Sequence, residues 1–317
     1  MNEKTWSWTV PAGTCPSRLD NYLLSLIPGE SRSRIQKWIR TGRVTVNGTR
    51  AKTGYRVHEG DRITWEPPPP SPTQPSPENI PLEILYRDDS LAVIVKPAGL
   101  VCHAGAGSSR GTLVNTLLYH LGPIDTGDPM RPGIVHRLDK QTSGLMVVAR
   151  DIESHRHLAR QFKNREVGKE YLAVVYGEPH PPQGTIDRAL GRDPRDRKRF
   201  SVRARRRRAA LTHYALERTC GPFALLRVRP ATGRTHQIRV HLAHLGHPVV
   251  GDQLYGAGRQ KSVTDPRLRH LVSGLGRHLL HACRLEFRHP RTGLTMSFSS
   301  PLPAEIARFL EAALAAP

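Results

Sequence analysis

Residues 135–148, VHRLDKQTSGLMVV, place one carboxylate, Asp139, between the cations Arg137 and Lys140. A Thr-Ser-Gly turn and an apolar run follow, so we expect Asp139 close before a buried strand. Burial would raise the pKa of this carboxyl group, and an adjacent arginine would lower it again. A carboxylate kept ionised by an arginine in a pocket is a good nucleophile or base. A structural ion pair explains the same residues, and the segment alone favours that simpler interpretation.

Other patterns that usually signal chemistry are missing. The glycine-rich run HAGAGSSRG, residues 103–111, matches neither a phosphate-binding loop nor a dinucleotide-binding fingerprint. The chain contains no G-x-S-x-G nucleophile elbow. Four histidines lie close together without an H-E-x-x-H pattern and without a carboxylate among them: His236, His241, His244 and His247. We therefore expect no cofactor and no metal site.

The charge of the chain indicates its class of partner. Its 317 residues include 48 Lys and Arg against 27 Asp and Glu, a formal net charge of +21. Such an excess favours polyanions, with nucleic acid first and an anionic membrane surface second. No apolar run is long enough to span a membrane, and the first residues lack the apolar core of a secretory signal. The four cysteines form no C-x-x-C pair, which fits a reducing compartment, so we expect a cytoplasmic protein.

A proline-rich stretch, EPPPPSPTQPSPENIP at residues 66–81, divides the chain. Proline-rich segments tend to form stiff, extended spacers, so we predict a small domain over 1–66, a linker over 67–81 and a large domain over 82–317. In the small domain, Ile35, Trp38 and Ile39 have the spacing of one apolar helical stripe, and an Asn-Gly turn follows between short strands. The exposed side of this helix is basic and suits RNA docking, although a solvated face explains it too. Its cations are Arg32, Arg34, Lys37 and Arg40.

In the large domain, strand-like runs outnumber helical ones and do not alternate with them regularly. The strands are expected at 91–101, 145–150, 171–177 and 223–230, and the helices at 154–167 and 304–316. This order predicts an α+β domain with a mainly antiparallel mixed sheet. Thr235 could cap a further helix, on which Arg239 would lie in the first turn and reach inward to an acid. The basic segment 191–211 is either a solvated loop or a binding site for an anion.

The small domain resembles a known RNA-binding module. The segments SRLDNYLLSLI (17–27), SRSRIQKWIRTGRVTVNG (31–48) and VHEGD (57–61) together are similar to an S4 domain, which occurs in several ribosome-associated proteins. The similarity covers about residues 17–65. It implies that the basic helix faces RNA.

Three segments of the large domain resemble the motifs of the RluA/RluD family of RNA pseudouridine synthases, in the order expected. They are HRLDKQTSGL (136–145), GKEYLAVVYG (168–177) and RPATGRTHQIRVHLAHLGHPVVGD (229–252). The resemblance implies that Asp139 is the catalytic carboxylate and that Arg239 pairs with it. It further implies that Arg137 helps to flip the target nucleotide and that Tyr171 packs against the uracil. By the same resemblance, Leu280 forms an apolar pocket wall.

The function that this resemblance implies is the isomerisation of specific uridines to pseudouridine without a cofactor. Large-subunit ribosomal RNA is the expected substrate, and the chain is expected to act as a monomer away from membranes. Whether Asp139 is a nucleophile or a base towards the ribose stays open. The alternatives are the same chemistry on tRNA, a non-catalytic RNA-binding factor in ribosome assembly, and a metal-dependent nuclease, which would need a carboxylate-rich site.

Overall fold

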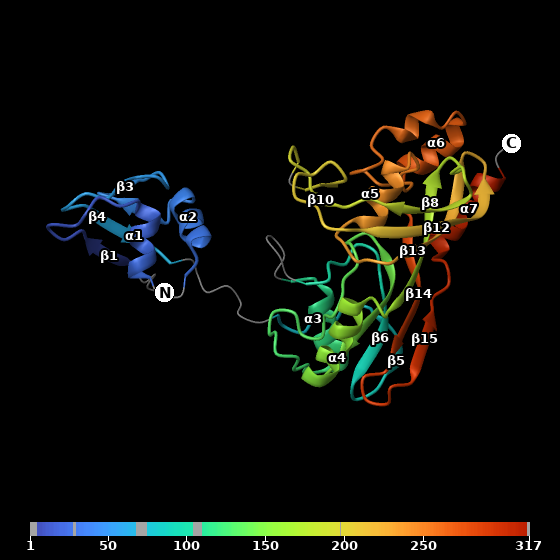
Figure 1. Ribbon diagram of the computed structural model, residues 1–317, viewed down its shortest axis with the longest axis horizontal. Helices are drawn as coiled ribbons and strands as arrows, with labels where there is room; N and C mark the ends of the chain where they lie inside the picture. The colour runs from blue at the N-terminus through green and yellow to red at the C-terminus, as the bar shows by residue number, and fades with distance from the viewer. Residues whose placement is uncertain (1–4, 28–29, 68–74, 104–109, 197, 316–317) are drawn as a thin grey trace. The chain divides into compact units, whose positions relative to one another are not determined.

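The chain forms two compact units, residues 1–73 and 74–317, in a computed structural model that describes residues 5–27, 30–67, 75–103, 110–196 and 198–315 (Figure 1). Each unit has its own buried apolar cluster. No helix within these ranges has the length and apolar character needed to cross a bilayer.

The first unit packs two helices, α1 (Leu19–Leu26) and α2 (Arg32–Arg40), on a four-stranded sheet. The sheet has the order β1 (Trp6–Thr9), β4 (Arg62–Trp65), β2 (Val44–Val46) and β3 (Thr49–Arg50). Ile35, Trp38 and Ile39 are buried, so the predicted apolar stripe of α2 is confirmed. Asn47 and Gly48 both have positive φ, as the tight hairpin between β2 and β3 requires.

The second unit is built on a nine-stranded sheet. Eight strands lie in the order β5 (Glu83–Arg87), β6 (Leu91–Lys96), β7 (Ser143–Ala149), β14 (Leu280–Arg288), β8 (Gly168–Tyr176), β13 (Phe223–Pro230), β12 (Leu211–Cys220) and β9 (Gln183–Asp187). The ninth, β15 (Thr295–Ser299), pairs with β14. All pairs are antiparallel except β7 with β14, which confirms the predicted α+β fold with a mainly antiparallel mixed sheet.

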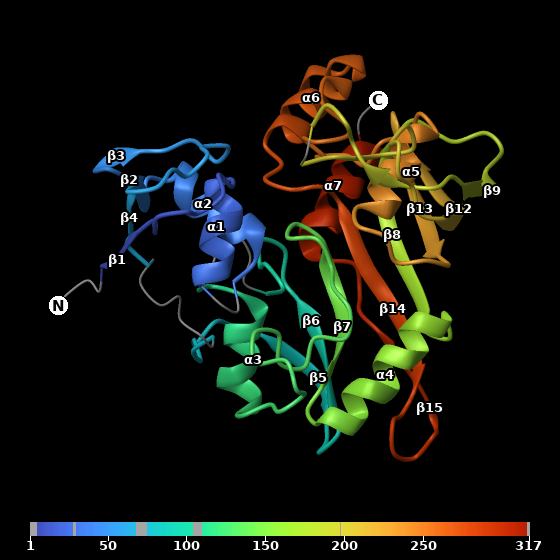
Figure 2. The same ribbon diagram turned by 60° about the vertical axis from the view of Figure 1, so that its left-hand side comes forward.

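Helices cover both faces of this sheet (Figure 2). Alternate residues of a strand point to opposite faces. Ile94 and Met146 therefore pack with α3 (Leu113–Leu121), whereas Val93 and Val147 pack with α4 (Ile152–Asn164). At the other end, α5 (Gln237–His244) covers one face of β8 and β13, and α6 (Pro266–Ser273) and α7 (Ala304–Leu314) cover the other. All seven residues of β7 are buried as a result.

Two short elements complete the second unit. The basic segment after residue 190 contains a small hairpin of β10 (Gly191–Arg192) and β11 (Phe200–Ser201). A 3-10 helix, η1 (Arg259–Ser262), precedes α6.

Part of the proline-rich segment belongs to the second unit. The side-chain amide of Asn115 on α3 donates to the carbonyl of Ser76 at 2.7 Å, and the amide of Glu78 donates to the carbonyl of Asn115 at 3.0 Å. The predicted linker, residues 67–81, therefore differs from the structure over 75–81, because polar groups at the start of α3 bind this segment. Residues 68–74 of the predicted linker lie outside the described ranges.

A glycine allows the close contact between β7 and β14. Gly144 has φ +119°, and a Cβ atom there would lie 2.3 Å from the carbonyl oxygen of Ala282. We predict that Gly144→Ala lowers the free energy of unfolding by about 3 kcal/mol, from backbone strain plus overpacking. Chemical denaturation would measure the loss.

Gly246→Ala is the matched control, because Gly246 also has a positive φ, +96°, but open space around its Cβ position. It should cost only the strain, about 1 kcal/mol. Equal losses for the two variants would contradict the steric argument.

Candidate active site

A pocket of about 500 Å³ opens in the second unit at the junction of several segments. Its walls are the loop before β7, the end of α4, the start of β8, residues 230–236 and the first turn of α5. The volume lies within the range of pockets that hold small molecules. All five predicted site residues of the second unit line this pocket: Arg137, Asp139, Tyr171, Arg239 and Leu280.

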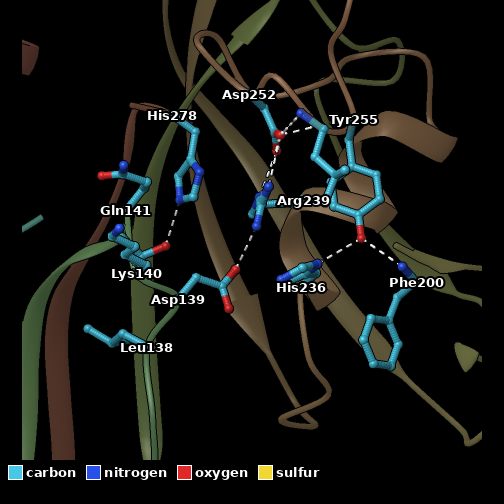
Figure 3. A network of polar contacts seen from close by, with 12 residues as sticks. Leu138, Asp139, Lys140, Gln141, Phe200, His236, Arg239, Asp252, Tyr255 and His278 are labelled. Atoms are coloured by element: carbon cyan, nitrogen blue, oxygen red, sulfur yellow. Dashed lines mark hydrogen bonds and ion pairs between the residues drawn. The ribbon is translucent and has the colours of Figure 1, made fainter. Parts of the chain in front are cut away.

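The centre of the site is one arginine shared by two carboxylates (Figure 3). The guanidinium of Arg239 forms a bidentate ion pair with Asp252, in which Nε donates at 2.7 Å and Nη2 donates at 2.9 Å. The third nitrogen of the guanidinium, Nη1, donates to Oδ2 of Asp139 at 3.0 Å. The expected pairing of Arg239 with Asp139 is thus observed. Oδ1 of Asp139 makes no hydrogen bond to any residue of the described ranges, so one oxygen of the carboxylate is held and the other is available.

Because the network is buried, the charge state of each group depends strongly on its partner. The side chain of Asp252 is fully buried, and those of Arg239 and Asp139 are 8% and 17% exposed. Burial acts to raise the pKa of Asp252, but the hydrogen bonds and charge of Arg239 outweigh it and hold the pKa below its usual value. Burial likewise acts to lower the pKa of Arg239, and the bond and charge of Asp252 raise it above its usual value. Both groups are therefore charged at neutral pH.

The backbone around Asp139 is held rigidly. The amide of Thr142 donates to the carbonyl of Asp139 at 3.0 Å, which closes a turn. The neighbouring carbonyl groups, of residues 138, 140 and 141, also accept hydrogen bonds from distant parts of the unit. Their donors are Cys102 Sγ, Lys96 Nζ, the Gly99 amide and Arg277 Nη1. Because residues 96–102 and Arg277 bind this short loop through its backbone, the position of Asp139 does not depend on its side-chain ion pair alone.

Two buried histidines anchor the same loop from β14 and the residues before it. A hydrogen bond of 2.8 Å joins Thr142 Oγ1 to His278 Nε2, and one of 2.9 Å joins Ser143 Oγ to His281 Nδ1. Burial lowers the pKa of each imidazole to about 4, so both are neutral at neutral pH. Thus β14 fixes the loop that carries Asp139.

The remaining predicted residues form the walls and rim. Tyr171 on β8 is half-buried, and burial followed by the nearby charge of Asp139 raises the pKa of its phenol, which stays protonated at neutral pH. Leu280, the first residue of β14, is buried in the wall. Arg137 is exposed at the rim and makes no ion pair or hydrogen bond with residues in the described parts of the chain.

One local prediction is wrong. Thr235 does not cap α5, because the helix begins one residue later, with His236 at the N-cap position and no side-chain cap. His236 has φ +57°, in the left-handed region. The side chain of Gln237 explains this geometry, since it binds the Arg234 amide at 3.0 Å and Thr212 Oγ1 at 2.9 Å and thereby holds the preceding loop in place.

Three residues of the site were missed from the sequence. Asp252 ends the third motif, and its carboxylate was the available signal. His236 also lies within the third motif, which was its available signal, whereas Tyr255 had none because its contacts span long sequence separations. The ring of Tyr255 lies 5.0 Å from the guanidinium carbon of Arg239, and its hydroxyl contacts His236 Nδ1 at 2.8 Å (Figure 3).

The predicted RNA-binding cations lie on α2 of the first unit, apart in the chain from the pocket residues. All four are exposed. Arg32 is 3.1 Å from the buried carboxylate of Asp20, and Arg34 pairs with Glu30 at 3.1 Å. Lys37 and Arg40 make no side-chain hydrogen bond or ion pair with a described residue.

The clustered histidines do not converge on one point. His241 bonds to Thr212 and to the Arg188 carbonyl, and His247 bonds to the Tyr176 carbonyl. Across the ranges that the structure describes, no group of three or more His, Cys, Asp or Glu side chains is arranged to hold a metal ion.

Comparison with known proteins places this fold and site. The chain matches the family described as RNA pseudouridylate synthase over residues 90–244 and the S4 domain over residues 17–63. Ribosomal large subunit pseudouridine synthase D of Xylella fastidiosa is 44% identical over 306 residues, covering 96% of this chain and 91% of that protein. An uncharacterized RNA pseudouridine synthase of Chlorobaculum parvum is 43% identical, covering 93% and 94%.

A solved structure supports the same assignment. Human RNA pseudouridylate synthase domain containing 1 has a TM-score of 0.57 and 27% sequence identity, covering 75% of this chain and 96% of that one. The chain therefore belongs to the family of RNA pseudouridine synthases, isomerases of uridine in RNA, and carries an S4 domain before the synthase domain. Both resemblances seen in the sequence are confirmed.

The ion pair of Asp252 predicts a pH-dependent stability. Because its folded pKa is lowered, the pair contributes stability above the unfolded pKa of about 3.9, and this contribution is lost as the pH falls through the folded pKa. We expect Asp252→Asn to lower the free energy of unfolding by about 3 kcal/mol at neutral pH, since it leaves Arg239 buried and poorly paired.

Urea denaturation of both proteins at about pH 7 and about pH 3 would test this, because about pH 3 lies below the unfolded pKa of about 3.9 and the difference between the two stabilities should be smaller there than at neutral pH. A difference that stayed constant across this range would show that Asp252 stabilises the fold by packing alone.

Proposed function

We propose that this synthase isomerises uridines of large-subunit ribosomal RNA, with Asp139 as its essential carboxylate. The observation that carries the catalytic part is the carboxylate of Asp139, which is bound at one oxygen only. Arg239 binds Oδ2, Oδ1 has no hydrogen-bond partner among the described residues, and Asp139 lines a pocket of about 500 Å³. The relatives named ribosomal large subunit pseudouridine synthase D, such as that of Xylella fastidiosa, support the choice of RNA.

The reaction conserves every atom of the nucleotide. The N1–C1′ bond of uridine breaks, the uracil turns in the pocket, and a C5–C1′ bond forms, after which C5 loses its proton and N1 gains one. Asp139 acts in this scheme as a nucleophile or as a base towards the ribose, and both roles need an ionised oxygen. Arg239 supports that ionised state, because an unpaired buried carboxylate would otherwise tend to neutralise.

The target nucleotide must leave its helical stack to reach Asp139, at a cost of a few kcal/mol. Arg137 lies at the rim of the pocket, where its side chain would occupy the space that the flipped nucleotide leaves in the RNA helix. Tyr171 offers an aromatic face for the uracil, and Leu280 closes the pocket with an apolar wall. Phosphate contacts made elsewhere on the basic surface would offset the cost of flipping.

Two basic surfaces are proposed to supply those contacts. One is helix α2 of the S4 domain with Arg32, Arg34, Lys37 and Arg40. The other is the segment 191–211, where Arg203 and residues 205–208 are exposed arginines. We further propose that the enzyme acts as a monomer in the cytoplasm, since one chain supplies the whole set of predicted pocket residues and the substrate is ribosomal RNA.

Asp139→Asn is expected to lower the rate of pseudouridine formation by at least about 10³-fold, because it removes an essential catalytic group. The variant protein should stay folded. Cells lacking the gene would receive wild type, Asp139→Asn or the control Asp89→Asn, whose carboxylate is 97% exposed. Pseudouridines in total RNA would then be mapped by chemical labelling and reverse-transcription stops.

Sites that vanish on deletion should return with wild type and Asp89→Asn only, and the RNA that carries them names the substrate. If the lost sites lie in tRNA alone, ribosomal RNA is not the substrate. Full rescue by Asp139→Asn would reduce Asp139 to a structural ion-pair partner.

Lys37→Gln with Arg40→Gln should weaken RNA binding without destabilising the S4 domain, because neither side chain has a partner among the described residues. If each cation contacts one phosphate, the slope of log K against log salt should fall by about 1.4 to 1.8 in total. Filter binding to a large-subunit ribosomal RNA transcript at several salt concentrations would measure the slope. An unchanged slope would place the RNA elsewhere on the domain.

A further inference from the structure

His236 stands apart from the other pocket residues in its backbone. Its φ of +57° is unusual for a residue other than glycine, and such strain is found mainly where the surrounding structure enforces it, often at functional sites. The Gln237 side chain holds the adjoining loop, as described above, so the strained position is built into the fold. The imidazole contributes to the wall of the pocket.

The hydrogen bonds of Tyr255 determine which nitrogen of His236 carries the proton. The amide of Phe200 on β11 contacts the Tyr255 hydroxyl at 2.8 Å, and a backbone amide can only donate, so the hydroxyl oxygen accepts. Burial raises the pKa of Tyr255 to about 12, so the phenol keeps its proton. The acceptor available to that proton among the described residues is His236 Nδ1, at 2.8 Å.

An Nδ1 that accepts leaves the proton of a neutral imidazole on Nε2. Burial lowers the pKa of His236, which favours the neutral form at neutral pH. Nε2 forms no hydrogen bond with residues in the described ranges and is not among the buried side-chain nitrogens that lack a partner. In Figure 3 it lies on the side of the ring that faces Asp139. The tyrosine thus presents His236 as a hydrogen-bond donor directed into the pocket.

We propose that the Nε2–H group of His236 donates a hydrogen bond to a carbonyl oxygen of the target uracil, with Tyr255 as the positioning residue that sets its tautomer. This assignment rests on the proposed function. Tyr171 and Leu280 offer the base flat and apolar contacts, which do not distinguish one pyrimidine from another. A fixed donor to O4 would distinguish them, because uracil carries an acceptor there where cytosine carries an amino group, whereas a donor to O2 would orient the base without this discrimination.

The packing of the basic hairpin of β10 and β11 contributes to the hydrogen bonding of Tyr255 and His236. Phe200 belongs to β11, so its amide reaches the Tyr255 hydroxyl only when the hairpin packs against Tyr255. The ring of Phe200 also lies 5.7 Å from that of His236. Recognition of the base is thereby linked to the segment 191–211, which we propose to contact RNA phosphates.

The test uses stem-loop RNAs centred on a uridine that the wild-type enzyme modifies, with uridine, 2-thiouridine or 4-thiouridine at that position. Sulfur is a weak hydrogen-bond acceptor, so each analogue weakens one candidate bond. Single-turnover rates would be measured for wild type, His236→Ala, His236→Gln, Tyr255→Phe and the double variant that combines His236→Ala with Tyr255→Phe. His244→Ala is the matched control, because His244 is an exposed histidine on the same helix.

We expect wild type and His244→Ala to react about tenfold more slowly with one of the two analogues, the size of effect of one lost hydrogen bond. His236→Ala should be slower on uridine and should lose that discrimination. His236→Gln, which keeps an N–H donor, should recover part of both. Tyr255→Phe should slow the reaction on uridine but add no further loss in the His236→Ala background, as a residue that acts through His236 requires.

Several results would overturn the proposal. Equal rates of wild type on all three RNAs, or a His236→Ala variant that keeps the discrimination, would show that His236 does not bind a uracil carbonyl. An additive effect of Tyr255→Phe would remove its positioning role. If wild type formed no pseudouridine in any RNA, the proposed function would fail as well, which is distinguishable from an active enzyme whose discrimination is independent of His236.

Discussion

The site depends on one buried guanidinium that is shared unequally between two carboxylates. Arg239 donates two hydrogen bonds to Asp252 and one to Asp139. Asp252 carries little solvent exposure and receives backbone amides as well, so it anchors the arginine. Asp139 then receives a charge partner without having both its oxygens occupied. An arginine bound to Asp139 alone would be free to take both oxygens, and the carboxylate would be an ordinary ion-pair partner.

The sheet supplies the precision that this arrangement needs. Asp139 lies in the loop just before β7, and the parallel pairing between β7 and β14 fixes the end of that loop. Gly144 permits the two backbones to approach, while His278 and His281 bind Thr142 and Ser143 from the β14 side. The same strand begins with Leu280 in the pocket wall. One strand therefore positions both the loop that carries the acid and an apolar surface beside it.

Charge is distributed according to two different needs. At the centre of the pocket the charges are buried and paired, since Arg239 binds both Asp139 and Asp252, because an unpaired charge in a poorly hydrated site is costly. The rim instead carries exposed cations such as Arg137. On α2 and the segment 191–211 the charges are numerous and predominantly positive, and most of the arginines are exposed, which suits a polyanion bound mainly through its phosphates. Arg32 is an exception among the cations of α2, since it also neutralises the buried carboxylate of Asp20. Substituting it would therefore combine loss of the proposed RNA contact with loss of an ion pair that stabilises the fold.

The sequence by itself determined the local and recurrent features: the apolar stripe of α2, the Asn-Gly hairpin, the predominance of antiparallel strands, and, through three ordered motifs, the identity of Asp139 and Arg239 as partners. These follow from short-range periodicity or from matches at a few positions. The start of α5 at His236 rather than Thr235 was decided by tertiary contacts, because Gln237 binds residues far away in the chain. The attachment of residues 75–81 to the second unit, the second partner of Arg239, and the path from β11 through Tyr255 to His236 were decided in the same way. Each joins groups that have no regular spacing, so only the packed structure brings them together.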